Sequence, residues 1–413
     1  MVAEFSPFRG VRYDCAALGT DLGMLAAPPY DVIDDDHRDA LEANHPENSV
    51  RLILPRDHAG GDRYERAAAT FAAWEAGGLL TRDPSQRLYG YRMDYTDHCG
   101  RSRHTIGVLG ALALPKHAGA GDILPHERTL PKAKSDRLDL LRATRVNLDP
   151  IWGLSTGAGL TRLISLDHEL CSCVDDDGVF HRLFAIDDPA SVAGIARAVA
   201  SAPLVLADGH HRFETAIAYR DERPAADEGA GSILCLVVEL TDDELCIHAI
   251  HRLATVPDRF DVLGALDQAF EVRAAGANTA DAVEVLQRRM QSERGIGLAL
   301  PDALHLLIPR SEVCAAALSS EPEPVRETDA ALVEAVVVPR LPSAQWRYRH
   351  DRAEVAAIVA KGDASLALLL RPVSVAATRA AAIARVRMPQ KTTFFYPKPR
   401  TGMVFRALDA PRD

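Results

Sequence analysis

Amphipathic patterns of two different periods follow each other in the first third of the chain. In residues 62–76, apolar and aromatic side chains recur near the 3.6-residue period of a helix, and a Gly77-Gly78 stop signal follows. In residues 87–114, side chains first alternate with a period of two and then form a mainly apolar run. The first pattern predicts a helix and the second a β-hairpin. The first 60 residues carry loop signals instead, including the prolines of Ala27–Ile33, which favour extended backbone.

Helix and strand patterns alternate through the second half of the chain. A helix at 191–201 precedes a short strand, Leu204–Leu206, and a second helix that opens near His210, and strands are expected at 232–240 and 244–254. Beyond residue 258, helices are predicted near 261–270, 280–293, 330–337, 351–361 and 374–386, and strands near 296–308 and 365–370. This order predicts a mixed α/β or α+β fold.

Length and charge narrow the class of protein. The 413 residues suffice for two or three domains, and 47% hydrophobic with 25% charged residues is typical of a globular chain. The net charge of −11 argues against nucleic acid as a partner. Apolar runs such as Leu366–Leu370 are far below the roughly 20 residues that span a bilayer, and the amino terminus lacks the charged-then-apolar pattern of a secretion signal. We therefore expect a cytoplasmic protein without a membrane partner.

Lysine is scarce, which draws attention to the few positions that keep it. Only six of the 47 basic residues are lysine, and five of these six lie within residues 116–134 and 391–398. Arginine replaces lysine wherever either cation serves, so the remaining lysines are candidates for sites that need a compact charge, such as phosphate sites. Chance placement on solvated faces is the alternative.

The densest group of candidate residues follows the strand Leu204–Leu206. Asp208, Gly209, His210, His211 and Arg212 stand where a strand runs into a tight turn and a helix. Such a turn directs free backbone N–H groups at one point, where an anion binds, and the guanidinium of an arginine adds a donor fork. We expect a phosphate or nucleotide contact here, with Gly209 small so that the anion can approach and replaceable without loss of the fold. Metal liganding by Asp208 with His210 and His211, and a purely structural turn, are the alternatives.

A second group lies in residues 123–137. Glu127 stands among cations, and a carboxylate beside a phosphate cradle has the chemistry of a general base. A solvated charge run that opens a helix is the alternative. The neighbours considered with Glu127 are His126, Lys132, Lys134 and Arg137.

These boxes support a resemblance to known families. Pro125-His126-Glu127 and Asp208–Arg212 resemble the two signature boxes of the ParB/sulfiredoxin-like fold, and in particular of ParB-like free-serine kinases. With Pro28–Ile33 and Met388–Lys398 added, the chain resembles the domain-of-unknown-function 1015 family over nearly its full length. The resemblance implies a ParB/sulfiredoxin-like nucleotide-binding core elaborated with further mixed α/β regions. It divides the chain into an N-terminal α+β region at 1–115, the core at 116–257 with an insertion around 155–185, and a C-terminal α/β region at 258–413.

The carboxy-terminal segment 388–405 is the third candidate. It combines aromatic and basic residues with two prolines and Gly402, and loops of this kind often carry binding residues. Lys391, Tyr396 and Lys398 are therefore candidates for a substrate site or a lid. A tail that straps two domains together through aromatic burial is the alternative.

Together these features favour a nucleotide-dependent phosphotransferase acting on a small, serine-like hydroxyl metabolite. Gly209, His210, His211 and Arg212, with Lys132, Lys134 and Arg137, would hold ATP or ADP. Asp208 would contact Mg²⁺, and Glu127, aided by His126, would take the hydroxyl proton. This assignment requires Glu127 and Arg212 to line one cleft. A hydrolase with the same cradle and a ParB-like, nucleotide-gated DNA-binding regulator are the alternatives, and a monomer and a homodimer both stay open.

Overall fold

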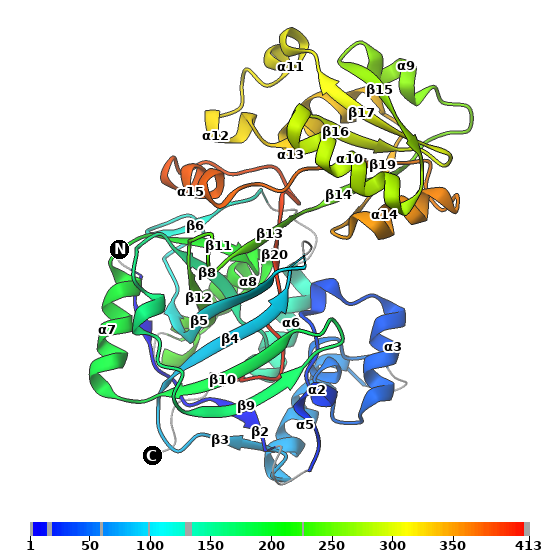
Figure 1. Ribbon diagram of the computed structural model, residues 1–413. Coiled ribbons are helices and arrows are strands. Elements are labelled where there is room, and N and C mark those ends of the chain that lie inside the picture. The colour runs from blue at the N-terminus through cyan, green and yellow to red at the C-terminus, as the bar shows by residue number, and fades with distance from the viewer. Residues whose placement is uncertain are drawn as a thin grey trace. The chain divides into compact units, whose positions relative to one another are not determined.

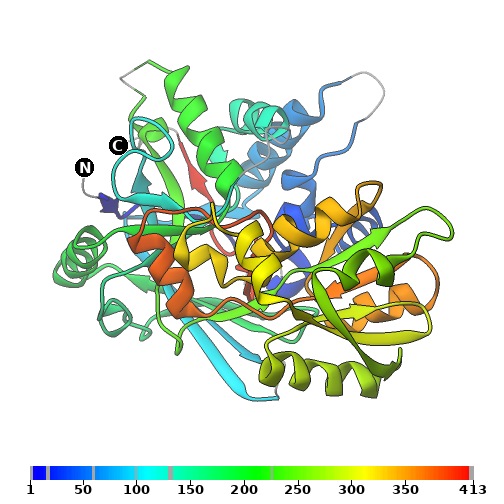
Figure 2. The ribbon, with the colours of Figure 1, turned by 90° about the horizontal axis from the view of Figure 1, so that it is seen from above.

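The chain folds into two compact units of mixed helix and strand (Figures 1 and 2). The computed structural model describes residues 3–14, 19–57, 61–97, 100–128, 134–224 and 227–408. Unit 1 comprises residues 1–125, 129–246 and 397–413, and unit 2 comprises residues 126–128 and 247–396. The mixed α/β class is thereby confirmed, and no helix within the described ranges is long and apolar enough to cross a membrane.

A mixed sheet of nine strands, counted over the described residues, forms the centre of unit 1 (Figure 1). Two of its pairs are parallel, β11 (Leu204–Asp208) with β6 (Ile123–Pro125) and β12 (Ser232–Glu239) with β8 (Ile151–Ser155), and the others are antiparallel. The sheet joins strands from residues 1–115 to strands from residues 116–257, the first two regions suggested by the sequence. Its order is β6 (Ile123–Pro125), β11 (Leu204–Asp208), β8 (Ile151–Ser155), β12 (Ser232–Glu239), β5 (Ser102–Ala113), β4 (Leu88–Thr96), β10 (Phe180–Ile186) and β9 (Glu169–Val174), with β1 (Phe5–Ser6) beside β5.

The apolar sequence of β12 explains why this strand lies inside the sheet. Its residues 233–238 are all buried, as expected for a strand whose two faces are both covered. Ile233, Cys235 and Val237 share a core cluster with residues of two helices, α7 (Pro189–Ala200) and α8 (His210–Asp221). Packing against this face therefore fixes the position of α8, the helix that carries the Arg212 box.

The amino-terminal residues contain more helix than their loop signals suggest. The described part of the first 60 residues includes α2 (Leu22–Leu25), α3 (Asp35–Asn44) and α4 (Val50–Ile53). The Asp34 side chain accepts a hydrogen bond from the His37 N–H and thereby caps α3. The cap stabilises the start of this helix, although its apolar face is weak. The expectation of a loop-rich start is therefore wrong for 35–44, whereas the helix predicted at 62–76 is confirmed as α5 (Arg63–Ala76). Helix α6 (Lys134–Thr144) completes unit 1, together with the two-stranded pairs β2 (Val11–Tyr13) with β3 (Leu80–Arg82) and β7 (Val146–Asn147) with β21 (Arg406–Ala407).

An antiparallel sheet of six strands, as far as the residues are described, forms the centre of unit 2. Alternation along β19 (Leu366–Leu369) places Leu366 and Leu368 in one core cluster and Ala367 and Leu369 in the other. Helices α10 (Ala280–Glu293) and α14 (Arg352–Ala360) cover the second of these faces. The sheet order is β15 (Phe270–Ala277), β17 (Ala303–Pro309), β16 (Ile296–Ala299), β19, β14 (His251–Thr255) and β18 (Gln345–Arg349).

The remaining elements of unit 2 are short. Helices α9 (Val262–Asp267), α11 (Ser311–Ala317) and α13 (Asp329–Leu332) contribute residues to the first core cluster. Strand β13 (Cys246–Ala249) pairs with β20 (Thr393–Tyr396) outside the main sheet. This pair brings the carboxy-terminal segment beside residues 246–249. The elements are β13 (Cys246–Ala249), α9 (Val262–Asp267), α11 (Ser311–Ala317), α12 (Glu323–Arg326), α13 (Asp329–Leu332), α15 (Val375–Ile383) and β20 (Thr393–Tyr396).

Candidate functional site

The strand, tight turn and helix predicted around Gly209 are present in unit 1. Strand β11 ends at Asp208, Gly209 adopts a left-handed conformation with φ 83°, and α8 begins at His210. A Cβ atom at residue 209 would lie 2.9 Å from Cγ2 of Ile151 and 3.1 Å from Nε of Arg212. Glycine is therefore favoured by the backbone and by close packing, and we expect a side chain here to destabilise the fold.

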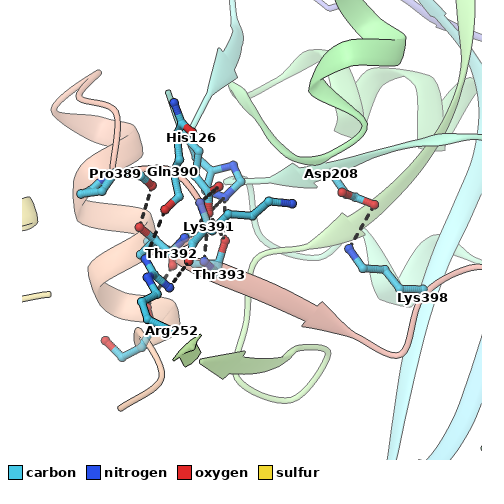
Figure 3. Close-up of polar contacts among 12 residues, drawn as sticks. His126, Asp208, Arg252, Pro389, Gln390, Lys391, Thr392, Thr393 and Lys398 are labelled. Atoms are coloured by element: carbon cyan, nitrogen blue, oxygen red, sulfur yellow. Dashed lines mark hydrogen bonds and ion pairs between the residues drawn. The ribbon is translucent and has the colours of Figure 1, made fainter. Parts of the chain in front are cut away.

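Three charged side chains meet beside this turn. The Lys398 Nζ atom lies 3.1 Å from Oδ2 of Asp208 (Figure 3), and a guanidinium nitrogen of Arg212 lies 3.4 Å from the same oxygen. Arg212 also donates to the carbonyl oxygen of Pro150. Burial disfavours the charged form of Asp208, but the two cations outweigh it and lower the pKa of Asp208 below its ordinary value. The trio carries a net charge of +1, because two cations face one carboxylate.

One donor of the Arg212 guanidinium group makes no hydrogen bond to the described residues. Its side chain is 10% exposed, and its Nε atom has no hydrogen-bond partner among the described residues. This donor faces the space that a Cβ of residue 209 would enter. His210 and His211, both half-buried, begin α8 at the same turn, and the first N–H groups of a helix have no acceptor within the helix. The Arg212 Nε atom, buried and without a partner in the described ranges, is therefore a candidate donor to an anion.

Glu127 lies in unit 2, where it receives hydrogen bonds from the segment after Met388. Its Oε2 atom accepts from the Lys391 N–H at 3.0 Å. Its Oε1 atom accepts from the N–H groups of Thr392 and Thr393 at 3.1 and 2.9 Å and from the Thr393 hydroxyl at 2.9 Å. Lys391 is left-handed with φ 54°, so three successive N–H groups form a concave anion site that a carboxylate fills.

Neighbouring residues hold the same segment from other sides. The buried His126 side chain pairs through Nε2 with the Thr393 hydroxyl at 2.8 Å and meets the Phe395 ring edge-on. Arg252 donates to the carbonyl oxygen of Lys391 at 2.8 Å (Figure 3). These contacts fix the backbone that the Glu127 carboxylate binds.

The other predicted residues have separate surroundings. Arg137 is buried, donates to the carbonyl oxygen of Ile53 and lies 4.4 Å from the ring centre of Tyr30. Tyr396 stacks on His248 with ring centres 4.9 Å apart. Lys132 and the side chain of Lys134 lie outside the described residues.

The predicted residues thus belong to two groups. The structure brings Asp208, Arg212 and Lys398 together in unit 1, and it places Glu127 and His126 against residues 391–393 in unit 2. That Glu127 and Arg212 line one cleft stays a prediction.

Two residues of the unit 1 site were missed by the sequence reasoning. The Tyr30 ring lies against the guanidinium groups of Arg137 and Arg212, at 4.4 and 5.8 Å from its centre. Asp149 is buried and accepts a hydrogen bond from the Thr401 hydroxyl. Burial raises the pKa of Asp149 although Arg212 opposes this shift. Tyr30 lies in the Pro28–Ile33 motif of the family resemblance and Asp149 precedes Pro150, but neither pattern marked a site residue.

Metal liganding by a preformed cluster has no support within the described ranges. No group of three or more His, Cys, Asp or Glu side chains there is placed to hold a metal ion. Asp208 could still contribute one carboxylate to a magnesium ion whose other ligands are water and phosphate.

A match to a protein-family model shows which family the chain belongs to. The model described as a protein of unknown function, DUF1015, matches residues 5–331, well over half of the 413 residues. The chain belongs to the DUF1015 family. The family resemblance inferred from the motifs is confirmed, although the Met388–Lys398 segment of this DUF1015 chain lies beyond the matched residues.

Solved structures show only distant likeness to this DUF1015 chain. A conserved hypothetical protein from Pyrococcus furiosus has 12% identity and a TM-score of 0.37, covering 70% of this chain and 92% of its own. A free serine kinase variant in complex with AMP has 12% identity and a TM-score of 0.39, covering 69% and 88%. SbnI from Staphylococcus aureus has 12% identity and a TM-score of 0.35, covering 71% and 85%. No curated protein sequence matches the chain.

Proposed function

We propose that this protein is a nucleotide-dependent phosphotransferase that acts on a small, serine-like hydroxyl metabolite. The observation that carries the proposal is the turn at Gly209. There a left-handed glycine, the start of a 12-residue helix and an unpartnered donor of Arg212 lie beside Lys398. Helix N-termini with an added guanidinium bind phosphate groups.

Asp208 has a positioning role in this proposal. Its carboxylate holds Lys398 and Arg212 at 3.1 and 3.4 Å, so both cations are oriented before a nucleotide arrives. Lys398 and Arg212 would then contact phosphate oxygens directly. When ATP or ADP is bound with Mg²⁺, the metal neutralises phosphate charge, and Asp208 is the residue of this turn that could contact it.

Glu127 is the general base of the proposal. Four donors stabilise its ionised form, which is the form that accepts a proton. The same donors give the carboxylate a second role, because it holds residues 391–393 in place. Substitution at residue 127 can separate the two roles, since only the second one contributes to stability.

We also infer that the sheet of unit 1 contains the ParB/sulfiredoxin-like core. The parallel pairs β6–β11 and β8–β12 support this inference. Helix α6 follows β6 in the chain and α8 connects β11 to β12, so both boxes lie at strand-to-helix transitions of one sheet.

Phosphoryl transfer from labelled ATP or ADP to L-serine tests the proposed function. The Lys398→Met variant removes the cation and leaves Asp208 with one partner, and Lys361→Met removes an exposed lysine as the matched control. Loss of a charge-assisted contact should weaken nucleotide binding about tenfold or more. Transfer by the wild type and the control, with impaired nucleotide binding in Lys398→Met, is the expected result. Nucleotide consumption without transfer to any hydroxyl compound would contradict the proposal.

A further inference from the structure

A small pocket rich in arginine lies in unit 1, among three helices of the amino-terminal region. Helix α4 contacts both α3 and α5, and all three helices contribute to the lining. The volume of the pocket is about 90 Å³, which is room for several water-sized groups. Three cations line the pocket together with one carboxylate, so the lining carries a net charge of +2. The lining residues, all of unit 1, are Glu42, Arg51, Pro55, Arg56, Arg66 and Thr70.

The carboxylate of Glu42 cannot balance all of these cations. Both of its oxygens accept a hydrogen bond from Nε of Arg56 at 2.9 Å. A guanidinium nitrogen of Arg51 lies 3.9 Å from Oε2 of Glu42, and Nε of Arg38 lies 3.5 Å from Oε1, both beyond normal hydrogen-bond length. Asp39 adds a second carboxylate, but it also pairs with Arg56. Both acids therefore bind mainly Arg56, and the other arginines lack a close carboxylate among the described residues.

Buried donors of two of these arginines have no acceptor. Arg51 donates to the carbonyl oxygen of Glu42 at 3.0 Å, but its Nε atom is buried without a hydrogen-bond partner among the described residues. The Nε and Nη2 atoms of Arg38 are also buried and lack a partner within the described ranges. Such donors destabilise a fold and call for an explanation, such as a bound ion or water. Water accepts hydrogen bonds but leaves the charge unbalanced, so the pocket favours an anion.

Arg66 adds to the excess of positive charge. It lies in the first turn of α5, where the helix dipole disfavours a cation. Within the part of the chain that the structure describes, its side chain makes no hydrogen bond or ion pair. Burial and the charge of Arg56 lower the pKa of Arg38, as expected where cations are crowded. When Arg38 and the two further acids near it, Asp35 and Asp39, are counted with the lining, a net charge of +1 remains.

We propose that this pocket binds a phosphate group and is a second anion site of the protein. A phosphate group presents more acceptor oxygens than a carboxylate does, and its charge of about −1.5 to −2 near pH 7 offsets that of the lining. Arg51, Arg56 and Arg66 supply the donors from three segments of the chain. The site does not rest on the proposed function, since its lining shares no residue with the Gly209 turn. Free phosphate and a small phosphomonoester are the two sources of this chemistry.

Arg66→Gln is the variant that tests the site. It removes one cation and keeps the helix, because arginine and glutamine have similar helix propensities. Arg197→Gln is the matched control, because Arg197 is an exposed arginine of α7 whose side chain also makes no hydrogen bond or ion pair to the described residues. Without ligand, both variants should melt close to the wild-type temperature. Lys398→Met reports on the Gly209 turn instead.

The test is a titration of inorganic phosphate and of methyl phosphate into each full-length protein at low ionic strength. The wild type, Arg197→Gln and Lys398→Met should bind at least one of these ligands. Arg66→Gln should bind it about tenfold more weakly, because a charge-assisted contact is lost. The tighter of the two ligands identifies the source as the free ion or a phosphomonoester.

Three results would overturn the proposal. The first is equal affinity of the wild type and Arg66→Gln for the ligand, and the second is the absence of binding to the wild type at millimolar concentration. The third is binding that Lys398→Met abolishes and Arg66→Gln preserves, because it would assign the phosphate to the Gly209 turn. That third result would leave the proposed function intact, so the two proposals fail separately.

Discussion

Replacement of Gly209 by alanine tests the link between the turn and the fold. Residue 209 has φ 83°, a conformation that costs a residue with a Cβ atom about 1–2 kcal/mol. The added atom would also lie 2.9 Å from Cγ2 of Ile151, and overpacking of this kind costs about 1–3 kcal/mol. We therefore expect Gly209→Ala to destabilise unit 1 by about 2–5 kcal/mol.

Thermal unfolding followed by circular dichroism measures this loss. A few kcal/mol lower the melting temperature of a unit of this size by roughly 5–15 °C. The matched control is Gly194→Ala in the interior of α7, where an added Cβ atom meets nothing within 4 Å. Alanine favours helix over glycine by about 1 kcal/mol, so this control should melt slightly above the wild type. A Gly209→Ala protein that melts with the wild type would refute the argument from backbone and packing.

Two further predictions concern unit 2. Glu127→Gln replaces a carboxylate that accepts four hydrogen bonds, so thermal unfolding should show a loss of about 1–3 kcal/mol, and turnover should fall by ~10² if Glu127 is the base. Unchanged stability together with unchanged turnover would exclude both roles. Burial lowers the pKa of His251 to about 3, and its Nδ1 atom accepts the Leu370 N–H at 3.0 Å. Because the unfolded histidine binds a proton near pH 6.5 and the folded one does not, this contribution to stability is present above pH 6.5 and is lost as the pH falls toward 3. The melting temperature of the wild type should therefore fall more steeply between pH 6.5 and pH 3 than that of His251→Asn. Equal slopes for the two proteins would contradict the lowered pKa of His251.

Local sequence patterns were enough to predict the elements whose hydrophobic period matches the burial of their faces in the structure. The helix predicted at 280–293 is α10, and the hairpin predicted at 87–114 is β4 with β5. Both carry a clear period because one or both of their faces pack against a core. Strands β15 and β18 carry no such signal, since most of their residues are exposed or half-buried. The composition of residues 274–280 is typical of a loop, but β15 continues through the first of these residues and ends at Ala277.

The site was predictable only where its residues are close in the sequence. Asp208, Gly209 and Arg212 form one box, and the turn that they predict is present. The ion pair of Asp208 with Lys398 joins residues 190 positions apart, and no local pattern encodes such a pairing.

Isothermal titration of ATP and ADP with Mg²⁺ into the full-length protein tests whether the chain binds a nucleotide. We expect at least one of the two to bind, and added salt to weaken binding because Lys398 and Arg212 contact phosphate. At a ligand concentration of 100 times Kd, the nucleotide should also stabilise the fold by about 2.7 kcal/mol. Absence of heat and of stabilisation with both nucleotides would contradict the proposed nucleotide site.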